Sequence, residues 1–176
     1  MNFINTLIED VFVIEPDKKG DERGWFMRTF DKDLFKKNIS SFDSNWVQIN
    51  QSFNKSKHTW RGFHYQKYPF AETKVVRCIA GSVLDCVLDL RESSETYLQT
   101  VQIELSSLNS KMIYIPTGCA HGYLTLEENS ELIYLHDEFY NPDYESGVKF
   151  NDRKISFTLP LYPKVISNRD FNHSDL

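Results

Sequence analysis

The feature that most constrains this chain is a succession of short apolar runs between residues 74 and 136, each followed by turn-forming residues. The runs lie at 74–80, 83–90, 100–105, 111–115, 122–126 and 131–136. Glycine, proline, asparagine or serine interrupts the chain between them, at 80–82, 92–94, 109–110, 116–118 and 127–129. Short strands at such regular spacing are typical of a β-sandwich or β-barrel. We therefore predict an all-β fold.

The flanks of this region add further elements. Strands are predicted at 11–15, 25–30, 46–52, 148–150 and 156–159. Residues 17–24 are predicted to form a turn because two glycines interrupt them, and residues 31–38 begin with a suitable N-cap, Asp31, and predict one short helix. The chain has 176 residues and no repeat, low-complexity segment or linker. It predicts a single domain over 1–176, in which residues 160–176 wrap the surface.

Composition excludes several classes of protein. The net charge of −5 argues against nucleic acid as the main partner, although a local basic patch can still hold a phosphate. No apolar run approaches the ~18 residues of a membrane span, and the N-terminus lacks the basic start and apolar core of a signal peptide. Cys78, Cys86 and Cys119 have no paired spacing and sit in apolar runs. Buried free thiols suit a reducing compartment, so we expect a cytoplasmic protein without a membrane partner.

Five polar residues interrupt two apolar, strand-like runs between residues 59 and 80: Arg61, His64, Gln66, Lys74 and Arg77. We interpret this stretch as the wall of a catalytic pocket that supplies a base and a cation. Nearby cations keep a histidine neutral and able to act as a base, and a buried lysine stabilises an enolate oxygen. Two other interpretations stay open: His64 as a hydrogen-bonded core residue, and Lys74 as a surface residue at a strand end.

Strand alternation assigns some of these side chains to faces. Asp85 and Asp89 share one face of the run 83–90, which indicates either a polar interior or solvent on that side. Arg61 lies opposite His64 in a regular strand, whereas a bulge at the intervening glycine would turn both to the same side. A carboxylate partner for His64 would fix its tautomer, and spacing alone does not distinguish four candidates: Asp85, Asp89, Asp137 and Asp170.

A metal-dependent site is a further alternative. Residues 116–122 (P-T-G-C-A-H-G) resemble the second cupin motif, whose histidine, here His121, is often a metal ligand. In the place of the first motif the chain reads H-Y-Q, with Gln66 where a second histidine is usual. A metal needs three or four convergent ligands, and His64 and His121 supply two. The pattern therefore favours a site without a metal.

Ordered motifs through nearly the whole chain resemble those of the dTDP-4-dehydrorhamnose 3,5-epimerase family. They are D-E-R-G at 21–24, Q-I-N-Q-S at 48–52, R-G-F-H-Y-Q at 61–66, K-V-V-R-C at 74–78, G-S-V-L-D-C-V-L-D-L-R at 81–91, I-P-T-G-C-A-H-G-Y at 115–123, Y-L-H-D-E-F-Y at 134–140 and N-D at 151–152. The resemblance implies a cupin-type double-stranded β-helix (jelly roll) with one or two short helices. It also implies a homodimer that exchanges N-terminal strands, and neither metal nor other cofactor.

The resemblance also implies roles for individual residues. By matching position, His64 is the base, Asp170 its orienting carboxylate, Tyr134 the acid on the opposite face and Lys74 the cation that stabilises the enolate. Substrate-binding roles fall to Arg23, Arg28, Gln48, Asn50, Arg61, His121, Phe139 and Tyr140. The implied reaction inverts C3 and/or C5 of a nucleotide-linked 4-keto-6-deoxysugar of the dTDP-4-dehydro-6-deoxyglucose type, in dTDP-rhamnose biosynthesis. Both carbons are alpha to the carbonyl, so their protons are acidic and no redox cofactor is needed.

Three positions depart from the family pattern. Arg28 replaces an acidic residue near the nucleotide base, Glu72 stands where glutamine is common, and Phe139 stands where tyrosine is common. The departures leave open an enzyme that inverts C3 alone or C5 alone, or one that acts on a GDP- or CDP-linked sugar. A metal-dependent cupin enzyme and a non-catalytic nucleotide-sugar binder are the remaining alternatives.

Overall fold

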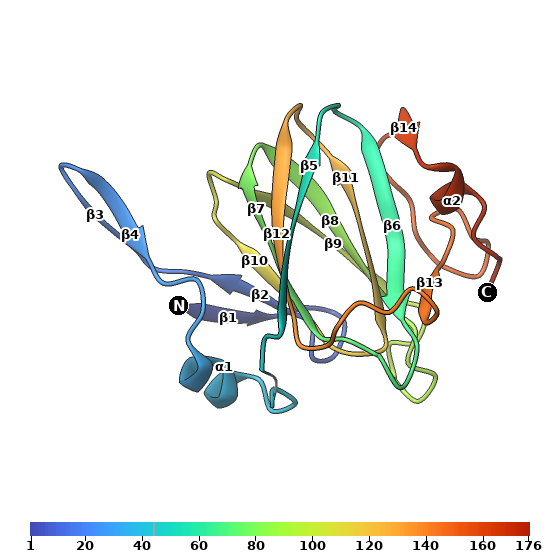
Figure 1. Ribbon diagram of the computed structural model, residues 1–176, viewed down its shortest axis with the longest axis horizontal. Coiled ribbons are helices and arrows are strands. Elements are labelled where there is room, and N and C mark those ends of the chain that lie inside the picture. Colours follow the sequence, from blue (N-terminus) through green and yellow to red (C-terminus); the bar gives the residue numbers. More distant parts are fainter. Residues whose placement is uncertain (44) are drawn as a thin grey trace.

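The computed structural model describes residues 1–43 and 45–176, and two β-sheets form its body (Figure 1). The first sheet runs, in spatial order, β1 (Asn2–Asn5), β2 (Phe12–Glu15), β10 (Met112–Ile115), β7 (Lys74–Ala80), β12 (Ser130–His136) and β5 (Gln48–Asn54). The second runs β13 (Glu145–Gly147), β6 (Thr59–Gln66), β11 (Cys119–Thr125), β8 (Ser82–Asp89) and β9 (Thr100–Ser106), and β14 (Val165–Ile166) pairs with β6. The all-β prediction is confirmed, and the described residues add two short helices, α1 (Lys32–Asn38) and α2 (Asn168–Phe171).

The main hydrophobic core lies between the two sheets. Val76 of β7, Ile113 of β10 and Leu132 of β12 pack in one cluster with Val87 of β8 and Leu105 of β9, and all five are fully buried. Strand alternation brings these side chains to the inner faces. Since Asp85 and Asp89 follow the same alternation as Val87 and are also fully buried, the polar-interior alternative holds for this strand.

The C-terminal part of the chain covers the outer face of the second sheet (Figure 1). Trp60 of β6 and Leu88 of β8 pack there against Val148 and Phe150 in a second buried cluster. The strands predicted at 148–150 and 156–159 are wrong, because backbone pairing with β6 ends at Val148, which exchanges hydrogen bonds of 3.0 and 3.1 Å with Phe63, and no strand forms at 156–159. Their apolar residues are explained by burial against that face.

A third cluster forms around helix α1, which packs on the first sheet. Asp31 is its N-cap and accepts hydrogen bonds from the backbone of Asp33 and Leu34, each at 3.2 Å, as predicted for the start of this helix. Phe35 is fully buried, and its ring lies 6.4 Å from that of Tyr114 on β10. The helix thus anchors the N-terminal segment to the body.

The N-terminal segment also forms a two-stranded hairpin, β3 (Lys18–Asp21) and β4 (Gly24–Met27), which projects away from both sheets (Figure 1). The predicted turn over 17–24 is confirmed only at residues 22–23, and it is wrong for 18–21, which form the strand β3. Its K-K-G-D sequence is exposed on both sides and has no apolar alternation to reveal it. Trp25 and Phe26 of β4 are 54% and 72% exposed, so the hairpin presents apolar surface.

Two expectations about the chemistry of the chain can be compared with the structure. Cys78, Cys86 and Cys119 are buried and free, as predicted. Within the described ranges, neither helix combines the length and the hydropathy that crossing a bilayer requires.

Candidate active site

A cavity of about 260 Å³ opens between the two sheets and receives side chains from both. Eight of the predicted site residues line it: Gln48, Asn50, Arg61, His64, Lys74, His121, Tyr134 and Tyr140. Glu72, Tyr123 and His136 also contribute to the wall. Most of these residues come from β5, β6, β7, β11 and β12, so the rigid strands of the sandwich position the site.

An irregularity in β6 brings Arg61 and His64 to the same side. On the neighbouring strand β11, His121 is paired with His64 and Tyr123 with Arg61, so two steps on β11 match three steps on β6. One extra residue therefore lies in β6, as in a β-bulge. Gly62 has φ +124°, and a Cβ there would lie 2.4 Å from the Cα of Gly122. The bulge alternative is thus correct, and the irregularity needs glycine.

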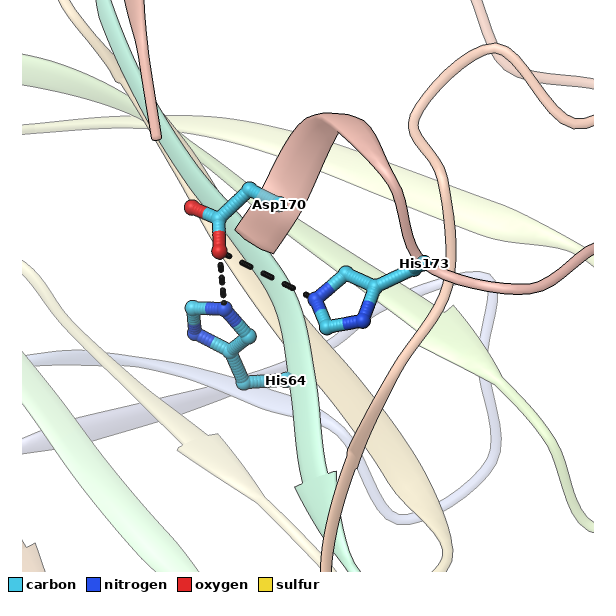
Figure 2. Close-up of side chains that lie close together, drawn as sticks. All are labelled: His64, Asp170 and His173. Carbon is cyan, nitrogen blue, oxygen red and sulfur yellow. Dashed lines mark hydrogen bonds and ion pairs between the residues drawn. The ribbon is translucent and has the colours of Figure 1, made fainter. Parts of the chain in front are cut away.

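His64 is held by Asp170, which lies 106 positions further along the chain. His64 donates Nε2–H to Oδ1 of Asp170 at 2.8 Å, as Figure 2 shows. Ser167, the N-cap of α2, accepts from the backbone N–H of Asp170 at 3.0 Å and so fixes the turn that carries this carboxylate. The hydrogen bond leaves Nδ1 as the ring nitrogen without a proton. Asp170 itself does not line the cavity but supports His64 from behind.

The electrostatics of this pair favour a charged carboxylate. Burial alone raises the pKa of Asp170, but the hydrogen bond from His64, the charge of His64 and the donors of Gly62 and Ser167 hold the pKa below its usual value. An ionised Asp170 stabilises the imidazolium that forms when Nδ1 accepts a proton. The pair therefore has the properties of an oriented general base.

Tyr134 of β12 enters the cavity from the opposite sheet. Its hydroxyl lies 3.0 Å from the hydroxyl of Ser52, which lies 3.1 Å from that of Tyr123. Burial and the nearby Tyr123 raise the pKa of Tyr134 well above its usual value, so the phenol is protonated at neutral pH. The hydroxyl chain offers a route by which Tyr134 can regain a proton that it has donated.

Lys74 begins β7 and is buried, which decides between the two interpretations of this residue. Its ammonium group contacts Oε1 of Glu72 at 2.7 Å, and Oε2 of the same carboxylate accepts from Nδ1–H of His136 at 2.7 Å. Burial raises the pKa of Glu72, but the charges and hydrogen bonds of Lys74 and His136 outweigh it and lower the pKa to about 2. Glu72 is therefore an ionised bridge between two residues of the cavity wall.

His121 has a carboxylate of its own. It donates Nε2–H to Oδ2 of the fully buried Asp85 at 2.8 Å. Burial raises the pKa of Asp85 although the charge of His121 opposes the shift. His64 and His121 are thus directed to different carboxylates, Asp170 and Asp85. Among the described residues, the group of three potential metal ligands that contains His64 is completed by Asp170 and His173 and leaves out His121.

Hydrogen bonds hold two groups of polar residues at the mouth of the cavity. Arg61 donates Nε–H to Oδ1 of Asn54 at 2.8 Å. Gln48 donates to Oδ1 of Asn50 at 3.1 Å and accepts from the backbone N–H of Tyr140 at 3.2 Å. These contacts orient amide and guanidinium groups toward the cavity, where they can bind the polar part of a ligand.

Three predicted ligand-binding residues lie outside the cavity. Arg23 is at the tip of the β3–β4 hairpin and pairs with Asp21 of the same hairpin, and Arg28 pairs with Asp31 beside α1. Phe139 does not line the cavity and is 60% exposed. Within one chain, the structure does not bring these three residues to His64.

Sequence reasoning assigns no functional role to Glu72 or His136 and names Asp85 only among four possible partners of His64, although all three contact predicted site residues. Glu72 departs from the family pattern, in which glutamine is common at this position. His136 shares strand alternation with Tyr134, and its ring stacks on that of Tyr134 at 6.1 Å. Alternation places Asp85 on the same face as Asp89 but does not say whether that face is inside, and the sequence gives no signal for which histidine Asp85 meets.

Comparisons with known proteins show what this chain is similar to. The family model described as dTDP-4-dehydrorhamnose 3,5-epimerase matches residues 5–176. The protein of that name from Shigella flexneri is 38% identical over 172 residues, which cover 98% of this chain and 94% of that protein.

Two crystal structures are similar to the whole fold. The dTDP-4-dehydrorhamnose 3,5-epimerase from Bacillus anthracis, with TDP and PPi bound, has a TM-score of 0.94 at 32% identity and covers 99% of each chain. The dTDP-6-deoxy-D-glucose-3,5-epimerase from Legionella pneumophila, in complex with dTDP-4-keto-L-rhamnose, has a TM-score of 0.91 at 33% identity and covers 98% of this chain and 90% of that one. The jelly-roll prediction is confirmed.

Proposed function

This chain belongs to the dTDP-4-dehydrorhamnose 3,5-epimerase family, and we propose that His64, Asp170, Lys74 and Tyr134 carry out its reaction. The protein is an epimerase that inverts C3 and/or C5 of a nucleotide-linked 4-keto-6-deoxysugar. The observation that carries the assignment of roles is the placement of His64 on one sheet and of Lys74 and Tyr134 on the other, around a single cavity.

The reaction begins with removal of a proton from the carbon beside the keto group. Nδ1 of His64 forms the new N–H bond, and the electron pair of the broken C–H bond moves onto the carbonyl oxygen as an enolate. Asp170 keeps Nε2–H in place, so the resulting imidazolium is stabilised. A positioned general base of this kind contributes ~10²–10⁴-fold to the rate.

The enolate is then stabilised and protonated. The ammonium group of Lys74 lies beside the oxygen that gains negative charge, and the loss of one such donor typically costs ~3–4 kcal/mol of transition-state stabilisation. Tyr134 donates its proton to the carbon from the opposite face, which inverts the centre. The phenolate regains a proton through Ser52 and Tyr123, and His64 releases its proton to solvent.

We further propose that the substrate carries dTDP and that both C3 and C5 are inverted. The relatives named above support this choice, because their names specify dTDP-linked sugars and 3,5-epimerisation. Gln48, Asn50, Arg61, His121 and Tyr140 bind the substrate. The free thiols and the nucleotide-sugar substrate suit the cytoplasm.

We also propose a homodimer in which the β3–β4 hairpin reaches the partner subunit. An isolated two-stranded hairpin is marginally stable in water, and this one exposes Trp25 and Phe26. Docking on a second copy would bury this surface and bring Arg23 to the partner's cavity. Arg28 and Phe139 bind substrate within the same assembly. Sedimentation velocity on the wild type and on the variant Trp25→Asp tests this proposal, since the variant should be monomeric.

Proton NMR in heavy water tests the proposed activity. The wild type should exchange the protons at C3 and C5 of dTDP-4-dehydro-6-deoxyglucose for deuterium, and exchange at one carbon alone would identify a monoepimerase. GDP- and CDP-linked 4-keto sugars are the matched controls for the nucleotide. Tight binding of all three sugars without any exchange would instead indicate a non-catalytic binder.

A further inference from the structure

A second histidine, His173, lies beside the His64–Asp170 pair (Figure 2) and does not line the cavity. Its Nε2 is 3.8 Å from Oδ1 of Asp170, the same oxygen that accepts the hydrogen bond from His64. The ligand atoms of the three side chains all lie within 4.8 Å of one another. Two nitrogens and one carboxylate oxygen therefore lie close together.

The fold holds His173 in this place without giving its Nε2 a hydrogen-bond partner. The ring lies edge-on to His64, with centroids 5.7 Å apart, and it occupies space opened by Gly147, where a Cβ would lie 2.3 Å from Nε2. Within the described part of the chain, Nε2 of His173 is buried and makes no hydrogen bond.

We propose that His64, Asp170 and His173 form a zinc-binding site that inhibits the enzyme. Zinc accepts histidine nitrogen and carboxylate oxygen at ~2.0–2.2 Å in tetrahedral geometry, with water in the remaining position, which places ligand atoms ~3.4 Å apart. The observed separations of 2.8 Å and 3.8 Å bracket that value. The two histidine nitrogens lie within 4.8 Å of each other, so rotation of the side chains must bring them together to close the site.

Zinc at this position would prevent His64 from acting as a base without entering the cavity that binds the sugar. The ion takes the place of the proton on Nε2 of His64, and that proton moves to Nδ1. Nδ1 then carries a hydrogen and cannot accept one from the substrate. Zinc should therefore lower kcat with little change in KM. The inhibition rests on the proposed role of His64, whereas zinc binding itself does not.

Isothermal titration calorimetry with zinc chloride alone tests the binding. The wild type should bind one zinc ion per chain, and His173→Phe, which keeps a ring against His64 and Gly147 but supplies no ligand, should not. His58→Asn is the matched control, because this histidine lies outside the cavity and outside the group of three, and the variant should bind zinc as the wild type does. Equal zinc binding by the wild type and His173→Phe, or none by the wild type, would overturn the site.

Deuterium exchange with substrate tests the inhibition separately. Saturating zinc should slow the wild type about 100-fold, the lower range for loss of a general base, and EDTA should restore the rate. His173→Phe should exchange at a rate close to that of the wild type and keep it in zinc. Stoichiometric binding that leaves the wild-type rate unchanged would refute the inhibitory role. A wild type that binds zinc but shows no exchange even without it would instead count against the proposed epimerase.

Discussion

Replacing Glu72 with glutamine is the sharpest perturbation of the cavity wall. The carboxylate contacts the ammonium group of Lys74 and Nδ1 of His136, each at 2.7 Å. Glutamine preserves the shape of the side chain but removes its charge and one of its two acceptor oxygens. The variant therefore leaves a buried ammonium without its counter-charge.

The expected loss of stability follows from the pKa of Glu72. A fall from 4.5 to about 2 is roughly 2.5 units, which corresponds to about 3 kcal/mol of stability at neutral pH. Removal of one partner from a buried pair costs ~3–5 kcal/mol, and the open cavity lets water reach Lys74, so the lower end of that range applies. We expect Glu72→Gln to lower the free energy of unfolding by about 3 kcal/mol at pH ~7.

The loss of stability in Glu72→Gln should depend on pH, and the pKa shift of Glu72 gives the direction of this dependence. The pKa of Glu72 is depressed in the folded state, so its contribution is complete above the unfolded value of 4.5 and is lost as the pH falls toward about 2. Near pH ~3 the difference between wild type and Glu72→Gln should have shrunk by about 2 kcal/mol. Urea unfolding of both proteins at several pH values measures this difference directly. Glu128→Gln, at an exposed position, is the matched control and should match the wild type throughout.

A difference in the free energy of unfolding between wild type and Glu72→Gln that stays constant from pH ~7 to ~3 would refute the link to the pKa of Glu72. A loss of stability no greater than that of Glu128→Gln would show that the bridge contributes nothing. Either result would remove Glu72 as the residue that holds the charge of Lys74 in place.

Three further substitutions test other parts of the site. Asp170→Asn removes the charge that stabilises the His64 imidazolium and should lower the rate of deuterium exchange ~10²–10⁴-fold in the NMR assay. Lys74→Met removes the cation beside the enolate and should lower kcat ~10²–10³-fold with a small change in KM, as steady-state kinetics would show; an unchanged kcat would exclude this role. Gly62→Ala places a Cβ 2.4 Å from the Cα of Gly122 at φ +124° and should cost more than ~2 kcal/mol in urea unfolding, whereas a neutral effect would mean that the bulge does not need glycine.

The sequence predicts the central strands well because their apolar runs and turns are unambiguous. The run at 74–80 matches β7 at both ends. The sequence fails where an element has no apolar period, as in β3, and where apolar residues are buried without strand pairing, as at Phe150. Local pattern reports burial and periodicity, and it cannot distinguish an edge strand from a segment that lies across a face.

Parts of the candidate site can likewise be predicted from the sequence, and other parts cannot. The motifs identify His64, Lys74 and Tyr134, and the structure places all three on one cavity. The side on which Arg61 lies depends on one extra residue in β6, which alternation cannot predict. The choice of Asp170 rather than Asp85 as the partner of His64 depends on contacts across 106 positions, which strand pattern does not encode.

The two-sided arrangement of His64 and Tyr134 is tested most directly by comparing deuterium exchange with inversion at the same carbon in His64→Ala and Tyr134→Phe. We predict that His64→Ala abolishes both exchange and inversion. Tyr134→Phe should still exchange the proton but return deuterium to the original face, so inversion stops. Unimpaired inversion in Tyr134→Phe, or exchange that persists in His64→Ala, would contradict it.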